Sequence, residues 1–374
     1  MTSVPFVDLR ARVAALRGEL DAALARVLDS GRFILGPEGE ALEAELARAL
    51  GAEHAVGVAS GTDALHLGLA ALGVGAGDEV VTSPLTAAFT ALAIVAAGAR
   101  PVFADVDPQT LNISPEATER AVTPRTKAIV PVHLYGHPAD MDPILALAKD
   151  RRLHVLEDAC QAHGALYKGR PVGTLGGLGA LSFYPTKNLG ALGDGGALLA
   201  AEKSLADRLR RLRNGGQSDR YRHETLGTNS RLDELQAAIL RVGLRHLPAW
   251  TKRRRALAAL YSSELQGAGV TLPREQPYAH AVYHLYVVRH PRRDALAAAL
   301  LERGVGTLIH YPIPLHLQPA FSDLGGREGD FPVAERAARE ILSLPLYPEL
   351  SDAQAHAVAA ALREATAHPT VGVG

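Results

Sequence analysis

ALSFYPTKNLGALGDGG, at residues 180–196, is the most informative segment of this chain. A β-prone run at 181–184 ends at Pro185, and Lys187 then stands among apolar residues and four glycines instead of on a charged helix face. Glycines leave the backbone uncovered, so another group can dock against it. A lysine in apolar surroundings is a candidate for a lowered pKa and for a role as a nucleophilic amine, whereas most loop lysines are simply solvated.

The composition argues against several classes of protein. The chain has 374 residues, 47% of them hydrophobic, which is enough for a large domain and a smaller one. Its 39 Lys and Arg residues are matched by 40 Asp and Glu residues, so it has no general attraction for nucleic acid or an anionic membrane. Cys160 is the single cysteine, which excludes an internal disulfide and a multi-cysteine metal site. With no visible signal peptide and no apolar run of membrane-spanning length, we expect a cytoplasmic protein.

From residue 54 onward, short apolar segments alternate with amphipathic helices. This alternation is typical of a largely parallel sheet covered on both faces, with functional groups at the strand ends. The predicted fold class is therefore α/β. We expect strands at 54–59, 78–82, 101–104, 128–132, 154–158 and 197–200, and helices at 63–72, 87–97, 115–122, 142–150 and 204–213.

Two loops outside this alternation have unusual compositions. Amphipathic spacing predicts helices at 8–30 and 38–50, and the apolar loop 33–37 between them should pack on the core or on a second subunit. The polar loop 214–229 contains three glycines and is long for a plain connector, so we interpret it as functional or interfacial.

The last third of the chain mixes a strand with helices without strict alternation. A helix at 231–247 should end at Pro248, because proline interrupts helices. We therefore predict a large domain at 1–247 and a smaller C-terminal α+β domain at 248–374. The elements expected in this last third are a strand at 282–288 and helices at 252–265, 292–303, 335–341 and 353–366.

The first predicted strand ends in Ser60-Gly61-Thr62-Asp63 at the start of a helix. A glycine, a hydroxyl and free amides at a helix start form a natural phosphate cradle. The alternative is an ordinary helix cap by Ser60 or Thr62. Nucleotide hydrolysis and a dinucleotide site are unsupported, because Lys187 is not followed by Ser or Thr and no GxGxxG joins this strand to its helix.

Further polar groups follow other strands. Glu157-Asp158 closes an apolar strand, where a carboxylate could pair with a cation or a protonated ring nitrogen, or could cap the next helix. The segment 310–316 interleaves histidine and tyrosine rings with prolines that hold the backbone extended. No carboxylate or cysteine stands beside these histidines at ligand spacing, so we expect contact with a polar substrate and no metal. A lysine, a strand-end carboxylate, a phosphate cradle and the Ser182 hydroxyl are the parts that a pyridoxal phosphate site requires.

Four motifs in this order resemble the DegT/DnrJ/EryC1/StrS family, whose members are mostly pyridoxal-phosphate-dependent nucleotide-sugar aminotransferases. They lie at residues 60–65, 157–162, 182–196 and 227–238. The resemblance implies a fold-type-I enzyme, similar to aspartate aminotransferase, with a mostly parallel seven-stranded sheet. It also implies glutamate as the amino donor, a keto sugar on a nucleotide as the acceptor, and a homodimer with shared active sites.

The resemblance assigns roles to individual residues. Lys187 matches the lysine that carries the cofactor, is displaced by the amino donor and then moves a proton, and Asp158 matches the partner of the pyridine nitrogen. Gln161 matches the residue near the ring hydroxyl. The matches to phosphate contacts are Gly61, Thr62, the backbone amide of Asp63, Ser182 and, from the other subunit, Asn229. His310 and Tyr311 match a substrate-side segment that also tends to come from the partner chain.

Two departures from the family pattern affect what the resemblance implies. Relatives commonly place an aromatic residue over the pyridine ring where this chain has Ala87, so ring stacking is absent, displaced to Phe89 or supplied by His163. Relatives often carry a larger residue at Gly215, which leaves the sugar preference open.

Two other functions compete with the aminotransferase. A deoxysugar dehydratase of the same family would carry histidine in place of Lys187. A non-enzymatic regulator is the second alternative, although the balanced charge and the lack of a basic recognition helix argue against DNA binding.

Overall fold

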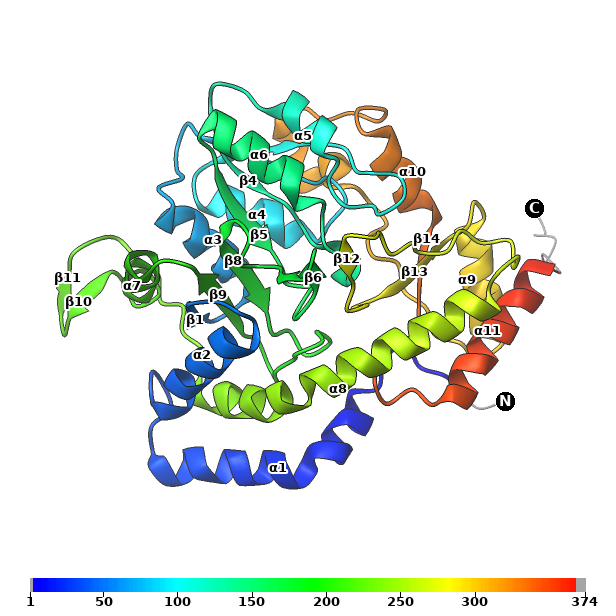
Figure 1. The fold of residues 1–374 in the computed structure, drawn as a ribbon, viewed down its shortest axis with the longest axis horizontal. Coiled ribbons are helices and arrows are strands. Elements are labelled where there is room, and N and C mark those ends of the chain that lie inside the picture. The colour runs from blue at the N-terminus through cyan, green and yellow to red at the C-terminus, as the bar shows by residue number, and fades with distance from the viewer. Residues whose placement is uncertain (1–2, 368–374) are drawn as a thin grey trace.

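A seven-stranded sheet forms the centre of the protein, for which a computed structural model describes residues 3–367 (Figure 1). Its order is β1-β9-β8-β5-β4-β2-β3, and β9 runs antiparallel to both of its neighbours while the other pairs are parallel. This arrangement confirms the predicted α/β class and the seven-stranded sheet. The strands are β1 (His54–Val58), β2 (Glu79–Thr82), β3 (Arg100–Phe103), β4 (Thr126–Val130), β5 (His154–Asp158), β8 (Gly177–Ser182) and β9 (Gly196–Ala200).

Helices cover both faces of this sheet because successive side chains of each strand point to opposite sides. Val56 and Val58 join one buried cluster with α3, α4 and α7, whereas Ala55 joins another with α2, α5, α6 and the first half of α8. The bounds are α2 (Pro37–Ala49), α3 (Gly61–Ala71), α4 (Ala88–Ala96), α5 (Pro115–Ala121), α6 (Met141–Arg151), α7 (Lys203–Leu212) and α8 (Glu234–Glu264).

The C-terminal third forms its own buried core beside the sheet domain (Figure 1). Val4 also belongs to this core, because the N-terminal segment pairs with Val305 before it enters α1 (Leu9–Ser30), which lies along α8. The proposed division at residue 247 stays a prediction. The elements of this third are β12 (Ala279–His280), β13 (Tyr286–Arg289), α9 (Arg293–Glu302), α10 (Pro332–Glu340), β14 (Ile341–Leu344) and α11 (Asp352–Ala367), with 3₁₀ turns at Leu315–Leu317 and Pro319–Leu324.

Pro248 does not end a helix, contrary to the sequence prediction. Helix α8 continues through it from Glu234 to Glu264. An internal proline costs a helix about 3 kcal/mol. The packing of α8 offsets this cost, because Leu247 is buried in the core of the sheet domain and Leu257 in the C-terminal core.

Other boundaries differ from the expected ones for local reasons. The strand expected at 282–288 is shortened to β13, because Tyr283 adopts a φ of 45° and the Val282 amide donates to Gly136. Helix α10 stops at Glu340, so that 341–344 pairs with β13 as the unpredicted strand β14. The polar loop 214–229 contains a hairpin that projects from the body of the protein in Figure 1. The sequence also did not predict β12, the three 3₁₀ turns (the first at Leu134–Gly136) or the short strands β6 (Leu166–Tyr167), β7 (Arg170–Pro171), β10 (Gln217–Asp219) and β11 (Arg222–His223).

Among residues 3–367, no helix combines the length and the apolar character needed to cross a membrane.

Candidate active site

The start of α3 lies directly against the end of β8. A Cβ atom at Gly61 would stand 2.6 Å from the Cβ of Ser182, so only glycine permits this contact. Gly196, at the start of β9, lies against the backbone of Ser60, because a Cβ there would be 2.3 Å from the Ser60 carbonyl oxygen. The helix start and the Ser182 hydroxyl therefore share one small region.

Ser60 caps α3, because its Oγ accepts a hydrogen bond from the Asp63 amide at 3.0 Å. The Asp63 amide, which we expected to contact a phosphate, is used here within the chain. The Asp63 carboxylate accepts from Ser230 Oγ at 2.9 Å, and Ser230 Oγ accepts from the Ala59 amide at 3.1 Å. Gly61 and Thr62 remain in the first turn, where helix N–H groups lack partners within the helix.

Asp158 is a buried carboxylate fixed by two hydrogen bonds. Oδ2 accepts from Thr90 Oγ1 at 2.8 Å, and Oδ1 accepts from the Cys160 amide at 3.2 Å. An ionised carboxylate can accept about four hydrogen bonds, so it keeps capacity for a further donor. No sequence motif pointed to Thr90, which comes from α4 and reaches β5 only through the tertiary fold.

The Lys187 turn is closed tightly by glycine. A Cβ at Gly190 would lie 2.4 Å from the Pro185 carbonyl oxygen, and the Lys187 amide donates to the Tyr184 carbonyl at 2.8 Å. Burial lowers the pKa of Lys187, while Cys160 and Asp158 act in the opposite direction. The structure therefore brings Lys187 and Asp158 together and favours the neutral amine more than water would.

Gln161 links two tyrosines of the same chain. Its Oε1 accepts from the Tyr135 amide at 2.8 Å, and its Nε2 donates to the Tyr311 hydroxyl at 3.2 Å. Burial, with Asp158 nearby, raises the pKa of Tyr311 to about 12. The Tyr135 hydroxyl donates to the His310 carbonyl, and His310 Nδ1 lies 2.9 Å from Ser343 Oγ. The segment with His310 and Tyr311, implied by the resemblance to come from a partner, thus contacts Gln161 of its own chain.

His163 and Phe89 differ sharply in exposure. His163 is fully buried with its ring centroid 6.0 Å from that of Phe183, whereas Phe89 is 59% exposed. Burial, helped by the charge of Lys187, lowers the pKa of His163 to about 3. Neither ring nitrogen of His163 has a hydrogen-bond partner within residues 3–367. A buried neutral ring with unused polar atoms beside Lys187 is consistent with a site built for another group.

Asn229 is exposed and lies at the end of the polar loop, paired through its backbone with Asn214. The adjacent Ser230 contacts the first turn of α3, as described above. Gly215 has a φ of +69°, and a Cβ there would lie 3.3 Å from the His223 ring. A larger residue at this position would be strained in this chain, because side chains rarely adopt this backbone geometry.

The residues present fit pyridoxal phosphate. The α3 start and Ser182 offer donors for a phosphate, Asp158 offers an anion for a protonated ring nitrogen, and Lys187 offers an amine for the aldehyde. In the described part of the chain, no group of three or more His, Cys, Asp or Glu side chains could hold a metal ion.

Known proteins resemble this chain over nearly its whole length. A model of the DegT/DnrJ/EryC1/StrS aminotransferase family matches residues 15–363. The dTDP-3-amino-3,4,6-trideoxy-alpha-D-glucose transaminase of Streptomyces venezuelae is 53% identical over 362 residues, which cover 96% of each chain. The crystal structure of S. venezuelae DesV in complex with a ketimine intermediate superposes with a TM-score of 0.97 at 52% identity, covering 98% of this chain and 100% of that one. NtdA from Bacillus subtilis with bound cofactor PMP gives a TM-score of 0.91 at 32% identity, covering 98% and 86%.

Proposed function

Because the chain belongs to the DegT/DnrJ/EryC1/StrS aminotransferase family, we propose that it transfers an amino group from glutamate to a keto sugar carried on a nucleotide. The cofactor is pyridoxal phosphate. The observation that carries the proposal is the placement of Lys187 near the buried carboxylate of Asp158, which Thr90 orients. Lysine at position 187 also favours the aminotransferase over a deoxysugar dehydratase.

Bound pyridoxal phosphate supplies an aldehyde that takes up an amino group and a ring that withdraws electrons from the neighbouring carbon. The first turn of α3, with Gly61 and Thr62, and the Ser182 hydroxyl would hold its phosphate. Asp158 would keep a proton on the ring nitrogen, since an adjacent anion favours the protonated form. Lys187 would hold the cofactor in the resting enzyme and then carry a proton at Nζ, a task for which a lowered pKa is suited.

The homodimer with shared active sites is part of this proposal. Three apolar residues of the loop after α1 are exposed although they are firmly held: Phe33 by 47%, Ile34 by 42% and Leu35 by 37%. The Glu234 amide donates to the Phe33 carbonyl at 2.9 Å, so this loop lies beside the segment that begins at Asn229. Rigid apolar surface is typical of an interaction site. A second copy of the chain would cover it and bring Asn229 to the other copy's phosphate.

The cytoplasmic location stays a prediction, and the single cysteine, Cys160, suits a reducing compartment.

A direct assay tests the proposed reaction. Purified protein loaded with pyridoxal phosphate is incubated with glutamate and a panel of dTDP- and UDP-linked keto sugars, and 2-oxoglutarate and amino sugar are measured. We expect equal amounts of both products with one or more acceptors, and none with Lys187→Ala. Product formation by Lys187→Ala at more than a trace, or a protein that takes up no cofactor, would contradict the proposal and favour a regulator.

A further inference from the structure

Arg12 reaches the catalytic turn from outside all four sequence motifs. It is the fourth residue of α1 and is only 8% exposed. Its Nη1 is 3.4 Å from the Lys187 carbonyl oxygen, and its Nε is 3.4 Å from Glu349 Oε1. The guanidinium also lies over the Trp250 ring, 5.1 Å from its centroid. An arginine held by an anion and an aromatic face has few orientations left, so its free donors point in a fixed direction.

The peptide that follows Lys187 is held on its other side as well. Asn188 is buried, and its Nδ2 donates to the Val282 carbonyl at 3.1 Å. Its Oδ1 lies 3.3 Å from His284 Nδ1. Buried Arg254 donates through Nη1 to the His284 carbonyl at 3.2 Å and to the Leu346 carbonyl at 2.8 Å. Contacts from opposite ends of the chain therefore meet at residues 187 and 188.

Apolar packing alone does not fix the turn on the side of α1. A cavity of about 30 Å³ separates α1 from the turn, with Arg12, Pro185, Gly190 and Trp250 among its lining residues. A void of this kind removes packing contacts that would otherwise resist small displacements. The hydrogen bond from Arg12 spans this loosely packed region.

We infer that Arg12 is a positioning residue for Lys187, acting through the Lys187 carbonyl. Glu349 and Trp250 hold the guanidinium, and the guanidinium holds the peptide that carries the amine. This inference rests on the proposed role of Lys187 as the residue that binds pyridoxal phosphate. Small displacements of reacting groups are expensive, with about 100-fold in rate for roughly 1 Å, so a contact of this kind affects the covalent step.

Attachment of the cofactor to cofactor-free protein tests the inference without measuring turnover. In this step Lys187 Nζ forms a C=N bond with the aldehyde carbon of pyridoxal phosphate, and water leaves. The rate is followed by absorbance, and borohydride trapping with peptide mass identifies the lysine. Arg12→Met keeps the apolar stem and removes the donors, and we expect attachment about tenfold slower. Arg12→Lys should recover part of the rate. Arg17 is an exposed arginine of the same helix that pairs with Asp21, so the control variant Arg17→Met should leave the rate unchanged.

The effect of an unpaired Glu349 must be separated from the effect on Lys187. Glu349 Oε2 is buried without a hydrogen-bond partner in the described residues. Arg12→Met therefore also leaves the Glu349 carboxylate without the arginine that pairs with it. Glu349→Gln keeps an amide oxygen that can accept from Arg12 Nε, so it keeps Arg12 in contact with Lys187 and should attach the cofactor at nearly the normal rate. Arg12→Met combined with Glu349→Gln removes both charges, and we expect its melting temperature to recover while its attachment stays slow.

Three outcomes would overturn the positioning role: a normal rate in Arg12→Met, an equal loss in Glu349→Gln, or full recovery of the rate in the double variant. If Arg12→Met does not fold, Arg12→Lys and the double variant still decide, because a normal rate in the double variant contradicts the role. A failure of the unmodified protein to be trapped at Lys187 would instead refute the proposed function, so the two failures are distinguishable.

Discussion

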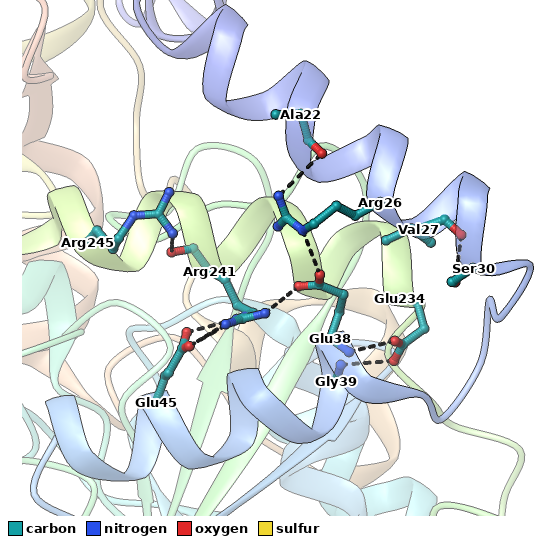
Figure 2. A network of polar contacts seen from close by, with 10 residues as sticks. All are labelled: Ala22, Arg26, Val27, Ser30, Glu38, Gly39, Glu45, Glu234, Arg241 and Arg245. Atoms are coloured by element: carbon teal, nitrogen blue, oxygen red, sulfur yellow. Dashed lines mark hydrogen bonds and ion pairs between the residues drawn. The ribbon is translucent and has the colours of Figure 1, made fainter.

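Replacing Glu234 by glutamine tests how the start of α8 holds the start of α2. The buried Glu234 carboxylate accepts three backbone hydrogen bonds, from Gly36 and Gly39 to Oε1 at 2.9 Å each and from Glu38 to Oε2 at 2.8 Å. Figure 2 shows this carboxylate beside Glu38 and Gly39, with Glu38 also bound by Arg26 and Arg241. Cβ atoms at Gly36 and Gly39 would each lie 2.7 Å from it, so both glycines are needed for the approach.

The expected loss follows from the donors that glutamine cannot satisfy. The amide oxygen can still accept from Gly36 and Gly39, but the NH₂ group would face the Glu38 amide and leave one buried N–H without an acceptor. That orphan N–H costs about 1–3 kcal/mol, and the loss of charge on the other bonds adds to it, so we expect destabilisation of about 3 kcal/mol. The negative charge at the N-terminus of α2 is lost as well, which acts in the same direction.

Thermal unfolding of the cofactor-free protein and hydrogen exchange of the peptide that covers residues 31–45 measure this change. We expect a lower melting temperature and faster exchange at the first turn of α2 in Glu234→Gln. Glu40 is an exposed carboxylate in the same turn, and Glu40→Gln is the matched control. It loses a charge at the helix start but no backbone hydrogen bond, so it should change both quantities much less. If exchange in Glu234→Gln is no faster than in the control, Glu234 does not hold the start of α2.

Three further predictions concern the active site. Asp158→Asn keeps the shape of a buried side chain but removes its charge, so turnover should fall by about 100-fold or more. Normal turnover in this variant would mean that another residue holds the ring nitrogen. Mixing inactive Lys187→Ala chains with inactive Asn229→Asp chains should restore activity in mixed dimers if sites are shared, and no recovery in dimers confirmed by mass would place Asn229 in its own chain's site. The pKa of His163 is about 3 in the folded protein and about 6.5 in the unfolded chain, so the unfolded chain binds more protons between these values. Through this histidine, the free energy of unfolding should therefore fall by about 2 kcal/mol as the pH is lowered from 6.5 to 5. The melting temperature of His163→Leu should depend less on pH than that of the unmodified protein, and an equal dependence would contradict this assignment.

The sequence was sufficient for the sheet domain because its signals are local. Apolar strands alternate with helices, and parallel strands bring their carboxyl ends to one edge, so Asp158 and Ser182 could be expected near each other. The same reasoning failed at Pro248, since the burial of α8 in two cores outweighs a local helix-breaking signal. It also missed β14, because whether residues 341–344 form a strand depends on pairing with β13, which lies more than 50 residues earlier.

The site itself shows what short motifs leave out. Motifs name the reactive side chains. Thr90, which orients Asp158, and Arg12, which contacts the Lys187 peptide, lie outside the motifs on helices whose spacing predicts only that they are helical. Their positions depend on how α4 and α1 pack, and packing is a property of the whole fold. Spacing alone therefore predicts which groups meet and does not predict how they are held.

Lys187 and the histidines around it form one electrostatic unit. Burial lowers the pKa of His163, His284 and His310, to about 3 for the first and about 4 for the last, and the charge of Lys187 lowers each of them further. Coulomb interactions are reciprocal, so a proton on any of these rings would lower the pKa of Lys187 in turn. While all three rings are neutral, Cys160 and Asp158 are the neighbours that raise the pKa of Lys187. When Lys187 loses its charge, the pKa of each nearby ring should rise, and His310, which is only partly buried, starts from about 4, above the value of about 3 for His163.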